Sequence, residues 1–285
     1  YMGSKGTHLV QISNINQFTG DLLNGGVFHG FNPSFSSINM AATDGNSSYH
    51  GGTLTVRKSM SQGLTFQAAY TYSKTIDTSE QEQGTTAFAD ENNRNLDRAL
   101  ASFNVPQRVS FAAFYDIPVL RTCGSWYCRA FGGWDVSAYG VFEKGLPLDV
   151  STSGVYPNGD YNADGTTYDR PNAPLTQIQT SGFSQQQFLA GIFTTTQFPK
   201  PALGTTGSLG RNAFQAPGFE RVDTALTKSF AITERFKLRF RIQASNTLNH
   251  TNLNAPSGNL TSASFGKVTG AAIPRQMSAS LMLRF

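Results

Sequence analysis

Acidic and amide residues grouped between positions 160 and 169 have a spacing that could hold a metal ion. Asp160, Asn162 and Asp164 place oxygen ligands at alternating positions, and a glycine follows at the sixth position. A calcium-binding loop opens in this way, and Asp169 could add a further oxygen. Position twelve is Pro171 rather than the glutamate of an EF-hand. The alternative is an Asx-rich turn whose side chains bond their own backbone, with no cofactor.

The two cysteines of the chain, Cys123 and Cys128, lie five positions apart. No further cysteine and no nearby histidine could complete a zinc site. The spacing favours a small disulfide loop formed in an oxidising compartment. The alternative is two free thiols in a turn.

Lys237, Arg239 and Arg241 alternate with apolar residues, so they lie on one face of a predicted strand. Such a face could attract anionic solutes. Alternatively, the three cations pair with acids on a neighbouring strand or on another part of the protein.

No set of residues typical of an enzyme emerges. The acids of one charged loop could form an acid/base pair, but a solvated surface is the simpler interpretation; they are Glu80, Glu82, Asp90 and Glu91. The four histidines are scattered, and Ser208 does not lie in a nucleophile elbow. We therefore expect no covalent catalysis.

Period-two alternation dominates the rest of the chain and predicts strands. In the final strand, Met277, Leu281 and Phe285 lie on the apolar face, opposite Ser278 and Ser280. Similar strands are predicted near residues 7–13, 48–60, 64–73, 108–117, 134–142, 219–232 and 236–248. The expected fold is therefore all-β and antiparallel, with about eight strands.

Short and long connections alternate between these strands. Short or moderate turns are predicted at residues 3–6, 61–63, 119–132 and 233–235, and long loops at 14–46, 77–105, 151–218 and 249–273. This asymmetry is typical of transmembrane β-barrels of the outer membrane, which have short periplasmic turns and long extracellular loops. Lys58 and Lys228 fall on the apolar face near strand ends, where we expect them to snorkel to the membrane interface.

The composition agrees with a barrel in outer-membrane lipid. Charged residues are only 14% of the chain although the hydrophobic fraction is 39%, so the polar surface is largely uncharged. No stretch is long and apolar enough for a membrane helix. The net charge of +4 without a dense basic run gives no support for nucleic acid as a partner. A soluble β-sandwich with one solvated face is the alternative. Residue 1 is Tyr1, and we expect the chain to be the C-terminal part of a longer protein.

A set of short motifs, in order along the chain, resembles the Oar-like TonB-dependent transporters. They are Gly-Ser-Lys-Gly-Thr-His-Leu at 3–9, Tyr-Thr-Tyr-Ser-Lys-Thr-Ile-Asp at 70–77, Asn-Ala-Asp-Gly at 162–165, Asp-Arg-Pro-Asn at 169–172, Gly-Ser-Leu-Gly-Arg-Asn at 207–212, Ala-Ser-Asn-Thr-Leu-Asn-His at 244–250, Phe-Gly-Lys-Val at 265–268 and Pro-Arg-Gln at 274–276. Tyr72 stands where a tryptophan is common in the family. Each motif alone is weak, but together they span essentially the whole chain.

The resemblance implies a barrel of roughly 22 strands that encloses an N-terminal plug. Residues 1–285 would then be the C-terminal part of that barrel domain, without the plug, and its first and last strands would be edges. A closed eight-strand barrel is the geometric alternative. The implied function is to bind and admit an extracellular solute, with the TonB complex acting through the missing N-terminal part. A passive structural or adhesive barrel without TonB coupling is the second hypothesis. The terminal Phe285 resembles the signal that the barrel assembly machinery recognises.

Overall fold

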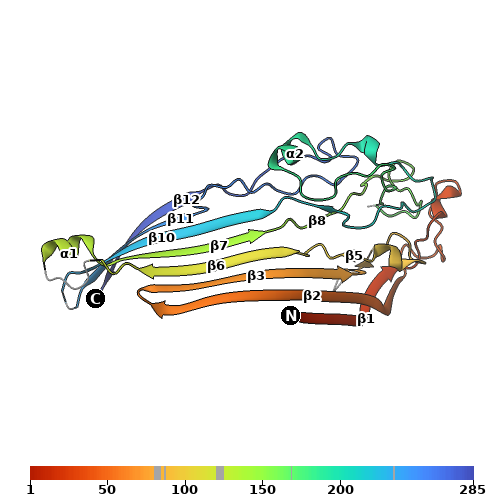
Figure 1. Ribbon diagram of the computed structural model, residues 1–285. Coiled ribbons are helices and arrows are strands. Elements are labelled where there is room, and N and C mark those ends of the chain that lie inside the picture. The colour runs from red at the N-terminus through yellow and green to blue at the C-terminus, as the bar shows by residue number, and fades with distance from the viewer. Residues whose placement is uncertain (80–84, 87, 120–124, 168, 234) are drawn as a thin grey trace.

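A computed structural model describes residues 1–285 except 80–84, 87, 120–124, 168 and 234. Its main feature is one long, curved sheet (Figure 1). Eight long strands make up this sheet: β1 (Met2–Asn14), β2 (Asn39–Ser61), β3 (Leu64–Asp77), β6 (Gln107–Asp116), β7 (Trp134–Glu143), β10 (Phe219–Ala231), β11 (Lys237–Ser245) and β12 (Gln276–Arg284). Each long strand pairs antiparallel with its neighbour in sequence, in the order β12-β11-β10-β7-β6-β3-β2-β1. The all-β antiparallel prediction is confirmed.

Short elements complete the described part of the chain. The sheet also includes β4 (Thr85–Thr86) beside β1 and β5 (Ala99–Leu100) beside β3, and β8 (Pro147–Leu148) pairs with β9 (Phe214–Gln215) in a separate sheet. The helices are α1 (Trp126–Phe131), α2 (Gln185–Ala190) and three 3-10 turns at Asp21–Leu23, Arg94–Asp97 and Thr195–Gln197. None of the described helices has both the length and the apolar character that a membrane crossing requires.

Strand register sorts the side chains into two faces, as the alternation predicts. Across five strands, Leu54, Tyr70, Val109, Phe142 and Glu220 are successive cross-strand partners. We call the face to which these residues belong the apolar face. Successive partners on the opposite side, here called the polar face, include Asp135, Thr227, Arg241 and Ser280. The apolar face stays open to the surroundings, because Leu54 is 68% exposed and Leu281 is 66% exposed. Such a broad exposed apolar band requires a nonaqueous surrounding.

The β2–β3 connection is a tight turn, as predicted. Gln62 and Gly63 have φ angles of 53° and 81°, which is the conformation of a type I′ hairpin turn. By contrast, the turn predicted at residues 3–6 is wrong. Those residues lie inside β1 and pair with β2 from Ser47 to His50. The glycine-rich composition that suggested a turn instead accompanies register shifts between Gly6 and Gln11.

The two ends of the sheet differ sharply. At the turn end, short hairpins and the β6–β7 connection with α1 join the strands (Figure 1). At the loop end, the long connections gather into one mass over the strand ends. The alternation of short and long connections is therefore confirmed for the long strands that the structure describes.

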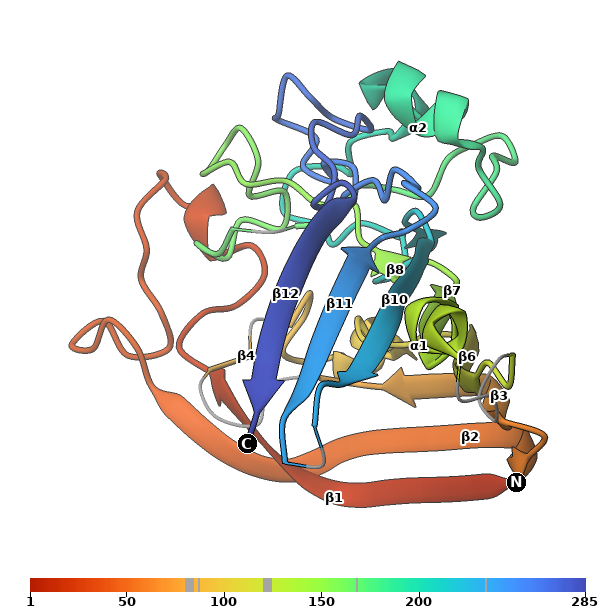
Figure 2. The same cartoon turned by 90° about the vertical axis from the view of Figure 1, so that its left-hand side faces the viewer.

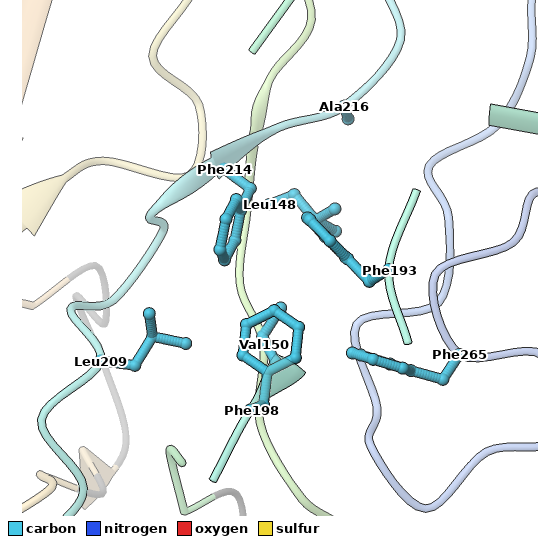
Figure 3. Packing of buried hydrophobic residues seen from close by; sticks show 8 residues of the cluster. All are labelled: Leu148, Val150, Phe193, Phe198, Leu209, Phe214, Ala216 and Phe265. Atoms are coloured by element: carbon cyan, nitrogen blue, oxygen red, sulfur yellow. The ribbon is translucent and has the colours of Figure 1, made fainter. Parts of the chain in front are cut away.

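The β7–β10 and β11–β12 loops share a hydrophobic core. Its buried residues come from segments 148–150, 193–216 and 265, and they are Leu148, Val150, Phe193, Phe198, Leu209, Phe214, Ala216 and Phe265 (Figure 3). The Phe193 and Phe214 ring centroids lie 4.5 Å apart. Loops that bury this much apolar surface together form a folded cap rather than irregular connections. We call the loop residues 146–217 and 251–273 the cap.

The sheet does not close on itself. Figure 2 shows it curving through a partial arc, with β12 on one side and β1 on the other. Within the described residues, β12 pairs with β11 alone, and β1 pairs with β2 and the short β4. The described strands therefore form an open, curved wall, and the larger barrel stays a prediction.

Candidate functional site

The polar face carries a cavity of about 870 Å³ between β6, β7, β10, β11 and β12. Polar side chains at its lining include Tyr139, Arg221, Asp223, Arg241 and Gln243. Side chains alternate between the two faces of a strand, and each of these residues is at a position that points to the polar face. This cavity is large enough for a small solute or a protein segment.

Two of the charged residues in this cavity neutralise each other. Arg221 Nε lies 2.9 Å from Asp223 Oδ1. A second guanidinium nitrogen of Arg221 donates to Ser245 Oγ at 2.6 Å, and the Asn246 amide donates to Asp223 at 2.8 Å. Arg221 is therefore held in place by contacts within the wall.

The predicted cations Lys237, Arg239 and Arg241 lie together on the polar face. Their cross-strand partners on β10 are Ala231, Ser229 and Thr227, and on β12 they are Arg284, Met282 and Ser280. No acid stands opposite them on either strand. Among the described residues, none of the three forms an ion pair, so pairing with acids on a neighbouring strand is wrong. Their positive charge is therefore available to attract a negatively charged group on the polar face.

The predicted oxygen ligands in the cap are buried and hydrogen-bonded to the backbone. Asp160 accepts from the Gly165 amide at 2.8 Å, and Asp164 accepts from the Thr166 amide at 2.7 Å. Asp169 accepts from the amides of Tyr161 and Asn162. Asn162 Oδ1 accepts from the Asp164 amide at 3.1 Å. These contacts are those of an Asx-rich turn, the alternative to a calcium site.

Burial changes the acidity of this cluster. Loss of hydration is the main reason why the pKa of Asp169 is raised to about 6; the negative charges of Asp164 and Asp160 contribute to the rise, and the two amide donors oppose it. Burial likewise raises the pKa of Asp160. Across the described residues, no group of three or more His, Cys, Asp or Glu has an arrangement that could hold a metal ion. Calcium binding here stays a prediction, and the observed contacts favour the turn.

Ion pairs join the cap to the loop between β3 and β6. Arg170 Nη1 lies 2.6 Å from Asp97 Oδ1, with both side chains buried. Arg211 pairs with Asp77 at the end of β3. Asn212 donates to the Leu100 carbonyl at 2.7 Å. The sequence motifs contain Arg170, Arg211 and Asn212, but their partners could not be identified from spacing.

In the described part of the charged loop of residues 77–105, Glu91 is more buried than predicted. Glu91 pairs with Arg94 at 3.1 Å, and only 16% of its side chain is exposed; burial raises its pKa. Asp90 Oδ1 accepts from the Asn92 amide at 2.9 Å. The solvated-surface interpretation is therefore wrong for Glu91, whereas Glu80 and Glu82 lie outside the described residues.

Three further predicted residues sit at the turn end. Cys128 in α1 is buried and disulfide-bonded, and Cys123 lies outside the described residues. Lys228 does not snorkel: it is 1% exposed, donates to the Gly132 carbonyl and lies 4.8 Å from the centre of the Phe230 ring. Phe285 follows β12 and is 91% exposed.

A comparison with protein-family models agrees with this architecture. A family model described as an outer membrane beta barrel domain matches residues 1–278. The outer membrane transporter YddB from Escherichia coli aligns with 99% of this chain at 10% sequence identity and a TM-score of 0.47. The chain spans 29% of the length of that transporter. Among curated proteins, no match was found.

Proposed function

This chain belongs to the outer membrane beta barrel domain family, and on that premise we propose that it is wall and mouth of an Oar-like, TonB-dependent transporter. Its place is the bacterial outer membrane, where the apolar face meets lipid. The transporter would bind an extracellular solute at the cap and admit it along the polar face. In this proposal the segment performs no covalent chemistry.

One observation carries the proposal. Lys237, Arg239 and Arg241 line the lumen without acidic partners on the strands beside them. Unpaired cations on an inner wall are costly to place close together unless a counter-charge arrives from elsewhere. An anionic solute, or an acidic surface of a plug inside the barrel, would supply that charge. A purely structural barrel would not require three neighbouring cations without acidic partners.

The proposal names three further partners. The TonB complex would act through an N-terminal part that these residues do not include. The barrel assembly machinery would recognise the exposed Phe285 after β12. The solute remains unidentified, because cap shape rather than a recognisable motif would select it.

Planar-bilayer conductance of the full-length protein tests the transporter against the passive barrel. A plugged transporter should be closed in buffer and conduct only after urea releases the plug. The isolated periplasmic domain of TonB should also bind the full-length protein and fail to bind a version that lacks the region before Tyr1. Constitutive conductance without TonB binding would favour the passive barrel instead.

A further inference from the structure

A cavity of about 320 Å³ lies on the apolar face at the loop end of the wall. Its floor is a row of cross-strand partners, Tyr70, Val109, Phe142 and Glu220, from β3, β6, β7 and β10. Because this row belongs to the apolar face, the floor continues directly into the surface that contacts lipid.

The roof of the cavity comes from the cap. Phe188 in α2 and Phe183 just before α2 line it from above. Their ring centroids lie 5.5 Å apart, and Phe183 also packs edge-on against Phe193 at 6.0 Å. The roof is therefore attached to the hydrophobic core of the cap (Figure 3 shows Phe193 in that core).

The backbone holds this roof in place. Ser184 and Gln187 form a capping box at the start of α2, which satisfies its first amides. The Ile192 amide donates to the Gly266 carbonyl at 2.9 Å. With α2 fixed over the wall, the space beneath it is a preformed cavity rather than a gap between mobile loops.

The chemistry of the lining selects an apolar guest with a polar end. Tyr70 and Phe142 give the floor its rings, and Phe183 and Phe188 give the roof its rings. The polar residues of the lining include Lys144, Gln215, Glu143 and Glu220. Within the described residues the Lys144 ammonium forms no ion pair. The volume is at the low end of the roughly 300–1,000 Å³ of small-molecule sites. Continuity with the lipid-facing surface means that an acyl chain can enter sideways from the membrane.

We propose that the cavity holds an acyl chain of an outer-leaflet lipid, with the lipid headgroup near Lys144. The bound chain would fill the space between α2 and the wall, and it would couple the position of the cap to the membrane. This role is independent of TonB and of the transported solute.

Brominated lipids test the proposal, because bromine on an acyl chain quenches a tryptophan that it contacts. The full-length Phe188→Trp variant is reconstituted in vesicles of phospholipid brominated on its acyl chains. Phe265→Trp is the matched control, since Phe265 is 6% exposed in the same core and does not line the cavity. The native Trp126 and Trp134 lie at the opposite end of the wall (Figure 1), and the unsubstituted protein gives their contribution.

We expect the tryptophan at position 188 to lose most of its emission and the control to lose little. Equal quenching of the two variants would overturn the proposal. If Phe188→Trp fails to fold, Phe183→Trp replaces it. As a second measurement, Ala216→Leu narrows the cavity and should reduce the quenching, whereas Ala213→Leu, outside the lining, should leave it unchanged.

Discussion

Arg170 and Asp97 lie 73 positions apart in sequence, yet their side chains meet at 2.6 Å in a buried ion pair between the cap and the β3–β6 loop. Arg170 also donates to the Leu96 carbonyl at 3.3 Å. The pair is one of several contacts that fix the cap above the wall. The two charges come from different loops and both are buried, so removal of one side chain leaves the charge of the other buried without a counter-charge.

Substitution Arg170→Met should therefore destabilise the packing of the cap by about 3–5 kcal/mol, since it isolates the Asp97 carboxylate. The readout is the rate at which an external protease cleaves the cap in outer-membrane vesicles. The double variant Arg170→Met/Asp97→Leu is the control and should recover much of the resistance. If the single and double variants are cleaved at the same rate, the ion pair does not hold the cap.

Protease resistance of the cap should also depend on pH through Asp169. Its folded-state pKa is raised to about 6 from an ordinary 3.8, so the folded state binds the proton more tightly than the unfolded state. The resulting stabilisation is fully present below about pH 4 and is lost as pH rises through about 6, with an upper limit of about 3 kcal/mol. Cleavage should be faster at pH 8 than at pH 5.

The variant Asp169→Asn keeps an oxygen acceptor for the Tyr161 and Asn162 amides but cannot ionise. We expect it to be more resistant than the parent at pH 8 and to show a weaker pH dependence. Asp169→Ala, which lacks the acceptor, should be cleaved faster at both pH values. An unchanged pH profile in Asp169→Asn would exclude Asp169 as the titrating group.

Calcium should leave the cap unchanged. The carboxylates of Asp160, Asp164 and Asp169 already accept backbone amides, and a calcium ion would compete with those donors for the same oxygens. Cleavage of the cap should be the same with excess calcium and with chelator. Protection by calcium, lost in Asp160→Asn, would instead establish the metal site.

If the polar face lines the lumen of the proposed transporter, neutralisation of its cations should alter permeation without altering folding. The double variant Arg239→Gln/Arg241→Gln removes two charges on the polar face that have no ion-pair partner in the described structure. After urea releases the proposed plug, anion selectivity in planar bilayers should fall. Arg235→Gln, in the turn between β10 and β11, is the matched control and should change selectivity little. Equal effects would show that overall charge, not position, controls permeation.

The turn-end lysines should differ in their sensitivity to substitution. Lys228→Met keeps an apolar stem but removes the donor to the Gly132 carbonyl, and we expect a loss of about 1–2 kcal/mol. Lys58→Met, on the same face but exposed, should be nearly neutral. Heat-modifiable migration of the folded barrel on gels measures both. A larger loss for Lys58→Met would contradict the buried role of Lys228.

Most of the strands, their two faces and the alternation of turns and loops could be predicted from sequence patterns alone. Period-two patterning is local, so residues such as Leu281 and Ser280 reveal their faces without knowledge of their neighbours. The same locality explains the error at residues 3–6, where glycine and serine signalled a turn but pairing with β2 extended a strand. Cross-strand hydrogen bonds override weak local preference.

How the loops fold depends on tertiary contacts that sequence patterns do not reveal. Phe193, Phe214 and Phe265 come from distant segments, and no periodic pattern in the sequence indicates that they share a core. The pairing of Arg170 with Asp97 and the burial of Glu91 likewise depend on which loops lie side by side. Contacts between segments far apart in sequence are set by chain topology, and a single sequence pattern does not encode that topology locally.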